Sequence, residues 1–198
     1  MTGREEGRTL YLLPDEAGRL IKAAATHIKP LLIFMLGSGA RMSEAMELDW
    51  REVKLGAAKV QFLKTKQRKR RVAHMPPAVV AALTKLSHRE GPVFRRPDGR
   101  PYIDRERRYG GQIKTAWCGA IRRAGLDPEL RPHDVRHTWA SWHYAIHKDL
   151  LLLKDEGAWS TVTLVTRYAH KIDDGHAAAI RTFWQLSGIG TDAVVATV

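Results

Sequence analysis

The chain has 198 residues, of which 44% are hydrophobic, which is enough for one packed domain and too few for two substantial ones. Its 33 Lys and Arg residues outnumber 21 Asp and Glu residues, and the net charge of +12 favours a polyanionic partner such as nucleic acid. The longest apolar run, 30–36, is too short to span a bilayer, and the first residues lack the apolar core of a secretory signal. We therefore expect a cytoplasmic protein with no membrane partner. The single cysteine, Cys118, excludes an internal disulfide and a cysteine-based zinc cluster.

The first elements expected along the chain are helices. A proline followed by two acids at 14–16 is typical of a first helical turn, because proline fits there and acids meet the positive end of the helix. The apolar run 30–36 indicates a buried helix that ends at the glycines of 37–39, and a short helix restarts over 43–48. Arg41 is therefore expected at the junction of two helices.

The pattern changes between residues 51 and 75, where short apolar runs are separated by Gly56 and a polar segment. This pattern predicts a small antiparallel sheet of two or three strands. Two prolines at 76–77 end the sheet and begin a helix over 79–86. The remainder is expected to be mainly helical, with helices over 112–124, from Pro132 onward, and over 150–153, 161–168 and 177–186. The sequence thus predicts an α+β fold that is mainly helical.

Two arginines that are far apart in the sequence stand beside groups able to handle phosphate and protons. Arg41 is followed three residues later by Glu44. On the helix that begins at the proline of position 132, His133, Arg136 and His137 lie on adjacent turns, since positions three and four apart share a helix face. Two guanidiniums that converge on one phosphate neutralise both non-bridging oxygens as a transition state forms. A tyrosine hydroxyl can then attack the phosphorus.

These residues occur in a fixed order with three further features: a basic segment at 64–71, Trp159 and Tyr168. In this order and spacing the sequence resembles the catalytic domain of the tyrosine site-specific recombinases, the phage integrase family. The resemblance runs from about Leu10 to His170. It implies the recombinase catalytic-domain fold, with its small antiparallel sheet near 51–75.

The resemblance implies site-specific DNA recombination and integration by strand cleavage and rejoining. Tyr168 would attack the scissile phosphate, leaving a 3′-phosphotyrosine and releasing a 5′ hydroxyl. Religation to a different 5′ hydroxyl conserves the bond energy, so no cofactor, metal or ATP is expected. The implied catalytic residues are Arg41, Lys66, His133, Arg136, Trp159 and Tyr168, and the implied supporting residues are Glu44 and His137. The resemblance also implies that Lys64, Arg68, Lys69, Arg70 and Arg71 bind DNA.

Within this set the resemblance implies a distinct role for each group. Glu44 would orient the first arginine, and a hairpin lysine would protonate the departing 5′ oxygen. Lys66 matches that lysine best, while Lys64 stays open because the hairpin length varies between relatives. Trp159 stands where many family members carry histidine. Because an indole N–H donates a hydrogen bond but does not titrate, His133 would carry more of the proton transfer.

Each feature also has a purely structural interpretation. Arg41 can cap a helix, Trp159 can pack in the core, and Tyr168 can anchor an amphipathic helix. Six basic residues among the eight of 64–71 are typical of a solvated patch that attracts phosphate without catalysis. Two histidines four residues apart, at 133 and 137, suit a metal, but no nearby carboxylates complete such a site.

The expected partners are double-stranded DNA and further copies of this chain. We expect a monomer in solution and a tetrameric synapse on paired DNA sites, with a catalytic domain over 1–170 and a C-terminal tail over 171–198. This tail resembles the segment by which recombinases dock on a neighbour, and its apolar face can equally fold back on its own domain. Family members usually place a separate DNA-binding domain ahead of the first motif, and here only about a dozen residues precede it, so we expect either an excised catalytic domain or a natural minimal protein. Two other functions remain open: a DNA-binding module without catalysis, and a nicking-closing enzyme like topoisomerase IB.

Overall fold

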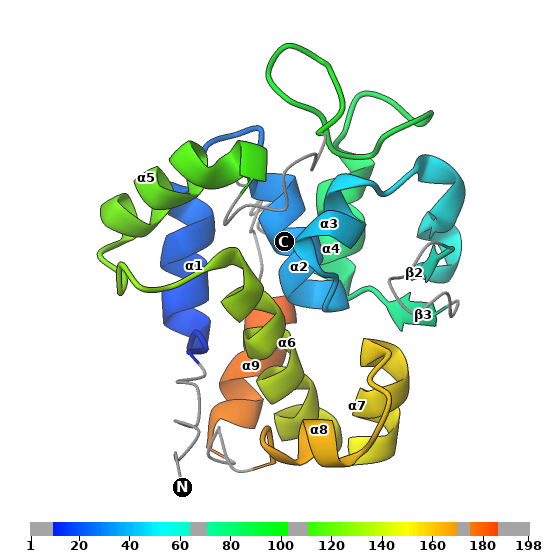
Figure 1. The fold of residues 1–198 in the computed structure, drawn as a ribbon, viewed down its shortest axis with the longest axis vertical. Coiled ribbons are helices and arrows are strands. Elements are labelled where there is room, and N and C mark those ends of the chain that lie inside the picture. The colour runs from blue at the N-terminus through cyan, green and yellow to red at the C-terminus, as the bar shows by residue number, and fades with distance from the viewer. Residues whose placement is uncertain (1–9, 64–70, 103–110, 170–174, 186–198) are drawn as a thin grey trace, which may run out of the picture.

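The computed structural model describes residues 10–63, 71–102, 111–169 and 175–185, and all structural statements below concern this part of the chain. Helices surround a buried central helix, and a three-stranded sheet lies at one side (Figure 1). The helices are α1 (Pro14–Ala23), α2 (Lys29–Ser38), α3 (Met42–Met46), α4 (Pro77–Thr84), α5 (Lys114–Ala124), α6 (Pro132–His147), α7 (Leu150–Gly157), α8 (Thr163–Thr166) and α9 (His176–Gln185). The strands are β1 (Val53–Lys54), β2 (Lys59–Phe62) and β3 (Arg71–His74). This arrangement confirms the predicted α+β fold. In the described ranges, no helix combines the length and the apolar character needed to cross a membrane.

The sheet lies within the predicted range and is antiparallel, in the order β1-β2-β3. Val53 pairs with Val60, and Phe62 at the end of β2 pairs with Arg71 at the start of β3. Successive side chains of a strand point to opposite faces. On β3 this alternation buries Arg71 and Ala73 and exposes the two residues between and after them. The register therefore directs an arginine into the protein.

The main core is built around α2, whose residues from Leu31 to Ser38 are all buried. A helix that is apolar on every side belongs in an interior, and α2 packs against both α4 and α6. It ends at Gly39, which has a left-handed backbone with φ of 63°. A Cβ on Gly39 would lie 2.3 Å from the ring of Trp139, so glycine also allows this close approach. This turn places Arg41 directly before the first residue of α3.

A second, smaller apolar cluster joins the middle of α6 to α7 and α8, which lie beside α6 in Figure 1. We call residues 150–168 the α7–α8 segment. Its buried members and their partners on α6 are Trp139, Ala140, Leu153, Val165 and Tyr168. The α7 helix also contacts β3. The segment is therefore attached to the rest of the protein through one face of α6 and the edge of the sheet.

The tail helix α9 packs against α6, and also contacts α1 and α4. Ile180 is fully buried, and the ring of Trp142 on α6 makes edge contacts with Phe183 and Trp184 at centroid distances of 5.0 and 5.9 Å. Of the two placements that the sequence left open, the structure shows this helix folded back on its own domain.

Candidate active site

Arg136 lies at the centre of the candidate site and is 2% exposed. Its guanidinium donates hydrogen bonds to two backbone carbonyls, that of Gly39 at the end of α2 and that of Gly157 at the end of α7. Its Cζ lies 4.4 Å from the centroid of a Trp159 ring. Burial, followed by the charges of Arg41 and other nearby groups, lowers the pKa of Arg136 to about 9. One side chain thus ties together the three segments that carry the predicted site residues.

Glu44 holds Arg41 in place. The Glu44 carboxylate accepts hydrogen bonds from the backbone N–H of Arg41 at 2.9 Å and from its Nη1 at 2.7 Å. The Glu44 side chain is only 5% exposed, whereas that of Arg41 is 26% exposed. Burial raises the pKa of Glu44, but the charge of Arg71 and the hydrogen bond from Arg41 outweigh it and lower the pKa below its ordinary value. An ionised glutamate therefore orients a guanidinium that still reaches solvent.

The structure corrects the expectation that Arg71 lies on the DNA-binding surface. Its side chain is 2% exposed, its Nη2 donates to Glu44 at 2.9 Å, and its Cζ lies 4.0 Å above the ring of Phe62. Its Nη1 donates to the carbonyl of Glu156 at 2.6 Å. Because it is the inward-facing first residue of β3, Arg71 completes a buried charge network. Only strand register decides this, since the basic segment looks uniform in sequence.

Tyr168 is buried in the second cluster and is 1% exposed. Its hydroxyl hydrogen-bonds with Nδ1 of His137 at 2.7 Å, and its ring lies 5.7 Å from that of Trp159. Burial raises the pKa of Tyr168 above its ordinary value, although the charge of Arg167 opposes this shift. The phenol is therefore beside the arginine cluster, protonated and shielded from solvent.

His133 lies beside the same cluster and is exposed. Its ring packs edge-on against His137, at a centroid distance of 4.8 Å. Partial desolvation and the charges of Arg136 and Arg41 lower the pKa of His133. The arginines from the two sequence motifs thus act on one imidazole, as expected for a shared phosphate site.

Five of the predicted basic residues cannot be placed: Lys64, Lys66, Arg68, Lys69 and Arg70 lie outside the described residues. They belong to the connection between β2 and β3, whose paired ends are Phe62 and Arg71. The choice between Lys66 and Lys64 as the general acid therefore stays a prediction.

Sequence reasoning missed Glu156 and the two histidines that contact it, His74 and His143. His74 and Glu156 are 82 positions apart, and no sequence motif connects them. The alternation of β3 could have placed His74 on the outer face of the sheet, but nothing local pairs it with a glutamate on a later helix.

The fold and the site define a tyrosine recombinase catalytic domain. The structure of XerA recombinase superposes with a TM-score of 0.70 and 22% sequence identity, covering 91% of this chain and 65% of that chain. The catalytic domain of bacteriophage HP1 integrase gives a TM-score of 0.64 at 22% identity, covering 94% of this chain and 100% of that chain. A sequence model described as the phage integrase family matches residues 11–174, and the chain belongs to this family.

Two relatives show how much of such a protein this chain spans. The integrase of Salmonella phage P22 is 32% identical over 174 residues, which cover 82% of this chain and 44% of that protein. The tyrosine recombinase XerD of Corynebacterium glutamicum is 25% identical over 162 residues, which cover 79% of this chain and 51% of that protein. The chain therefore spans about half the length of these relatives.

Proposed function

We propose that this chain cleaves and rejoins DNA strands in site-specific recombination, through a 3′-phosphotyrosine intermediate. The observation that carries the proposal is the position of Arg136, whose guanidinium binds the carbonyl of Gly39, two residues before Arg41, and lies under Trp159. Family membership and the recombinase fold support it. A structural neighbour, the Tn1549 transposon integrase, is described in complex with circular intermediate DNA, which supports DNA as the partner.

In the proposed first step, the scissile phosphate binds between the two arginines. Arg41 is the partly exposed member of the pair and meets the phosphate first, while Arg136 lies beneath Trp159 and approaches from the interior. The indole N–H of Trp159 adds a neutral donor. These groups stabilise the charge that develops on the phosphate oxygens.

In the proposed second step, the Tyr168 oxygen forms a bond to phosphorus and the bond from phosphorus to the 5′ oxygen breaks. Lys66 donates a proton to the departing 5′ oxygen, and His133 takes part in removing the phenol proton. The pKa of His133 is lowered by desolvation and by neighbouring arginines, so it is neutral and able to accept a proton at neutral pH. Because Tyr168 is buried against His137, the phenol has to leave that contact before it attacks.

Rejoining reverses these events with a different 5′ hydroxyl, which attacks the phosphotyrosine and releases the phenol. The phosphoryl bond is exchanged rather than hydrolysed, so no external energy source enters the scheme. Exchange between two duplexes needs two cleaved strands in one complex, so we propose a monomer in the absence of DNA and a tetramer of this chain on paired sites.

The test uses DNA duplexes with a randomised central sequence and a nick close to the cleavage point. After cleavage, the short fragment that carries the new 5′ hydroxyl is released at the nick, so rejoining cannot occur and the covalent adduct accumulates. We expect an SDS-resistant adduct with the wild-type chain and none with Tyr168→Phe. Tyr144→Phe is the matched control, since Tyr144 packs at the edge of the same cluster. Arg41→Ala and Arg136→Ala are each expected to slow adduct formation by about 10²-fold or more.

Two outcomes would replace the proposal. DNA binding without any adduct would identify a binding module. Relaxation of an unrelated supercoiled plasmid, with no exchange between duplexes, would identify a nicking-closing enzyme.

A further inference from the structure

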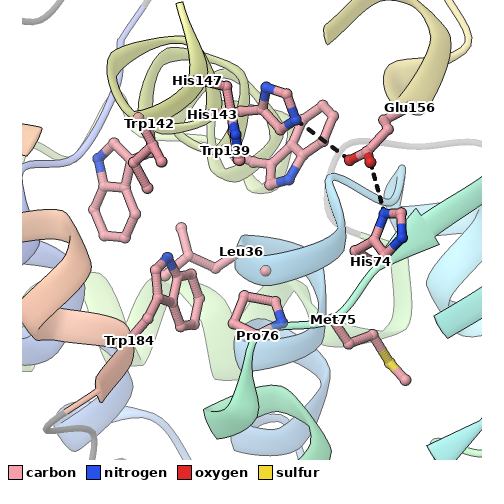
Figure 2. A pocket seen from close by; sticks show the side chains of 12 residues that line it. Leu36, His74, Met75, Pro76, Trp139, Trp142, His143, His147, Glu156 and Trp184 are labelled. Carbon is pink, nitrogen blue, oxygen red and sulfur yellow. Dashed lines mark hydrogen bonds and ion pairs between the residues drawn. The ribbon is translucent and has the colours of Figure 1, made fainter. Parts of the chain in front are cut away.

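The carboxylate of Glu156, at the end of α7, bridges histidines from two other elements (Figure 2). Its Oε1 lies 2.7 Å from Nδ1 of His74, the last residue of β3, and its Oε2 lies 3.3 Å from Nε2 of His143 on α6. The ring of His147 packs against that of His143 in a tilted arrangement, at a centroid distance of 4.5 Å. In the described part of the chain, no three His, Cys, Asp or Glu side chains are arranged to hold a metal ion. The bridge is therefore a set of hydrogen bonds and ion pairs between three elements.

The backbone of the same turn contacts both buried arginines. The carbonyl of Glu156 accepts a hydrogen bond from Arg71, and the carbonyl of Gly157 accepts one from Arg136. The last carbonyls of a helix lack partners within the helix and carry its negative end, so they suit guanidinium donors. The position of this turn consequently sets where the two guanidiniums lie.

The turn has little freedom to move without disturbing the site. A Cβ on Gly157 would lie 1.7 Å from the ring of Trp159, and Ala158 has a left-handed backbone with φ of 52°. The same ring of Trp159 covers Arg136. A shift of about 1 Å in catalytic geometry can cost a hundredfold in rate, so whatever holds this turn matters to the chemistry.

Apolar packing alone holds α7 weakly. Only Leu153 and Gly157 of its eight residues are buried, and Leu151 is 60% exposed. A helix of this length is marginal in isolation. The contacts of Glu156 to β3 and α6 therefore form a large part of its attachment.

The chemistry of the bridge fits a stable attachment. Burial raises the pKa of Glu156, but the hydrogen bonds from His143 and His74 outweigh it and lower the pKa below the ordinary value. In the described residues, Nδ1 of His143 is buried without a hydrogen-bond partner. A proton on Nε2 of His143 suits this site, because a buried N–H at Nδ1 without an acceptor would be costly. That N–H donates to the ionised Glu156.

We propose that Glu156 is a positioning residue for strand cleavage. Its contacts to His74 and His143 fix the last turn of α7, and the carbonyls of that turn fix the two buried guanidiniums. Glu156 acts through Arg71 and Arg136 and does not touch DNA. This inference rests on the proposed function.

The test compares three variants in single-turnover cleavage of the nicked duplex at saturating DNA. Glu156→Leu keeps the volume but removes the bridge, and we expect cleavage to slow by about tenfold to a hundredfold with unchanged DNA affinity. Glu156→Gln keeps a carbonyl oxygen that accepts from Nε2 of His143 and adds an amide N–H that can donate to His74. Its cleavage rate should therefore stay within about threefold of wild type. Asp155→Leu, next to it on α7 with a side chain that is 70% exposed, is the matched control and should match wild type.

A wild-type cleavage rate for Glu156→Leu would overturn the inference and leave the proposed function intact. Equal losses in the Leu and Gln variants, or parallel losses of DNA affinity and cleavage, would also overturn it, because they indicate a general structural role. Absence of any adduct with the wild-type chain would overturn the proposed function instead. In that case, hydrogen exchange tests separately whether the Glu156 bridge holds α7. The amides of α7 should exchange faster in Glu156→Leu than in Asp155→Leu, and equal exchange rates would overturn the inference.

Discussion

The two halves of the candidate site are held by regions of different construction. Arg41 follows α2, which is buried along most of its length in the main core, and a buried carboxylate orients it. Tyr168 ends the α7–α8 segment, which packs in a smaller cluster against one face of α6. Arg41 is thus set by the main core, Arg136 joins the two regions through the carbonyls of Gly39 and Gly157, and the phenol belongs to an element with few buried contacts.

This difference suits the proposed chemistry. Charged groups that stabilise a transition state work best when they are fixed in advance. The buried phenol, in contrast, has to leave His137 before it reaches a phosphate, and elements that move are drawn from regions of low local stability. The comparison predicts that the arginine network and the α7–α8 segment respond differently to substitution.

The strongest test of the core side is Glu44→Ala. It leaves the guanidinium of Arg71, 2% exposed, without its carboxylate partner, and breaking a buried ion pair in this way costs about 3–5 kcal/mol. We expect urea denaturation at pH 7 to show a loss of unfolding free energy of this size. The control is Glu47→Ala, an exposed glutamate at the end of the same helix. A loss below about 1 kcal/mol would mean that the network contributes little to the core.

The next test compares two leucines, one from each region. Leu32 is 2% exposed in the main core and Leu153 is 0% exposed in the second cluster. Replacing either with alanine removes a buried side chain and should cost about 2–5 kcal/mol locally. We expect Leu32→Ala to lower the stability of the whole domain. Leu153→Ala should mainly speed hydrogen exchange in α7 and α8, and an equal loss of global stability in both variants would break the comparison.

A smaller effect is expected from acid. The pKa of His133 is lowered below 6.5 by desolvation and by nearby arginines, so the unfolded chain takes up this proton at a higher pH than the folded chain. Stability from this group is present above pH 6.5 and falls as the pH drops from there through the folded pKa. An NMR titration should show the lowered pKa of His133, and Arg167→Gln should raise it, while Arg122→Gln on α5 should not. A pKa at or above 6.5 in the wild-type chain would contradict the gathering of arginines around this ring.

The smallest effect concerns the contact that holds the phenol. His137→Phe keeps an aromatic ring but removes the hydrogen bond to Tyr168, which is worth about 1 kcal/mol. We expect nitration of Tyr168 by tetranitromethane to accelerate about fivefold. Tyr144 in the same protein is the internal reference. An unchanged ratio of the two rates would show that packing, and not His137, shields the phenol.

Much of the fold could be predicted because local residue types mark where its helices begin and end. Prolines at the starts of α1, α2, α4 and α6 and the glycine after α2 mark helix ends through backbone geometry that no distant contact alters. The alternating apolar pattern gave the sheet its range. The site residues at 41, 136, 159 and 168 could be named because their spacing matches a family, and the structure places them in one cluster.

The direction of side chains at the sheet could not be predicted. Arg71 looks like its basic neighbours in sequence, yet the pairing of Phe62 with Arg71 turns it into the core. A shift of register by one residue would have turned it outward. The contacts of Glu156 with His74 and His143 could not be predicted for a related reason, since they join three elements that become adjacent only after folding.

The sequence by itself determined which segments become helices and strands, that the chain suits a polyanionic partner, and which residue types are available to the proposed chemistry. Local backbone preferences, net charge and motif spacing do not depend on the final packing. Tertiary structure alone decided that Arg71 is buried on Glu44, that α9 folds back on its own domain and that the phenol of Tyr168 is covered. Those outcomes depend on strand register and on which apolar faces meet, and both are set by contacts between residues far apart in the chain.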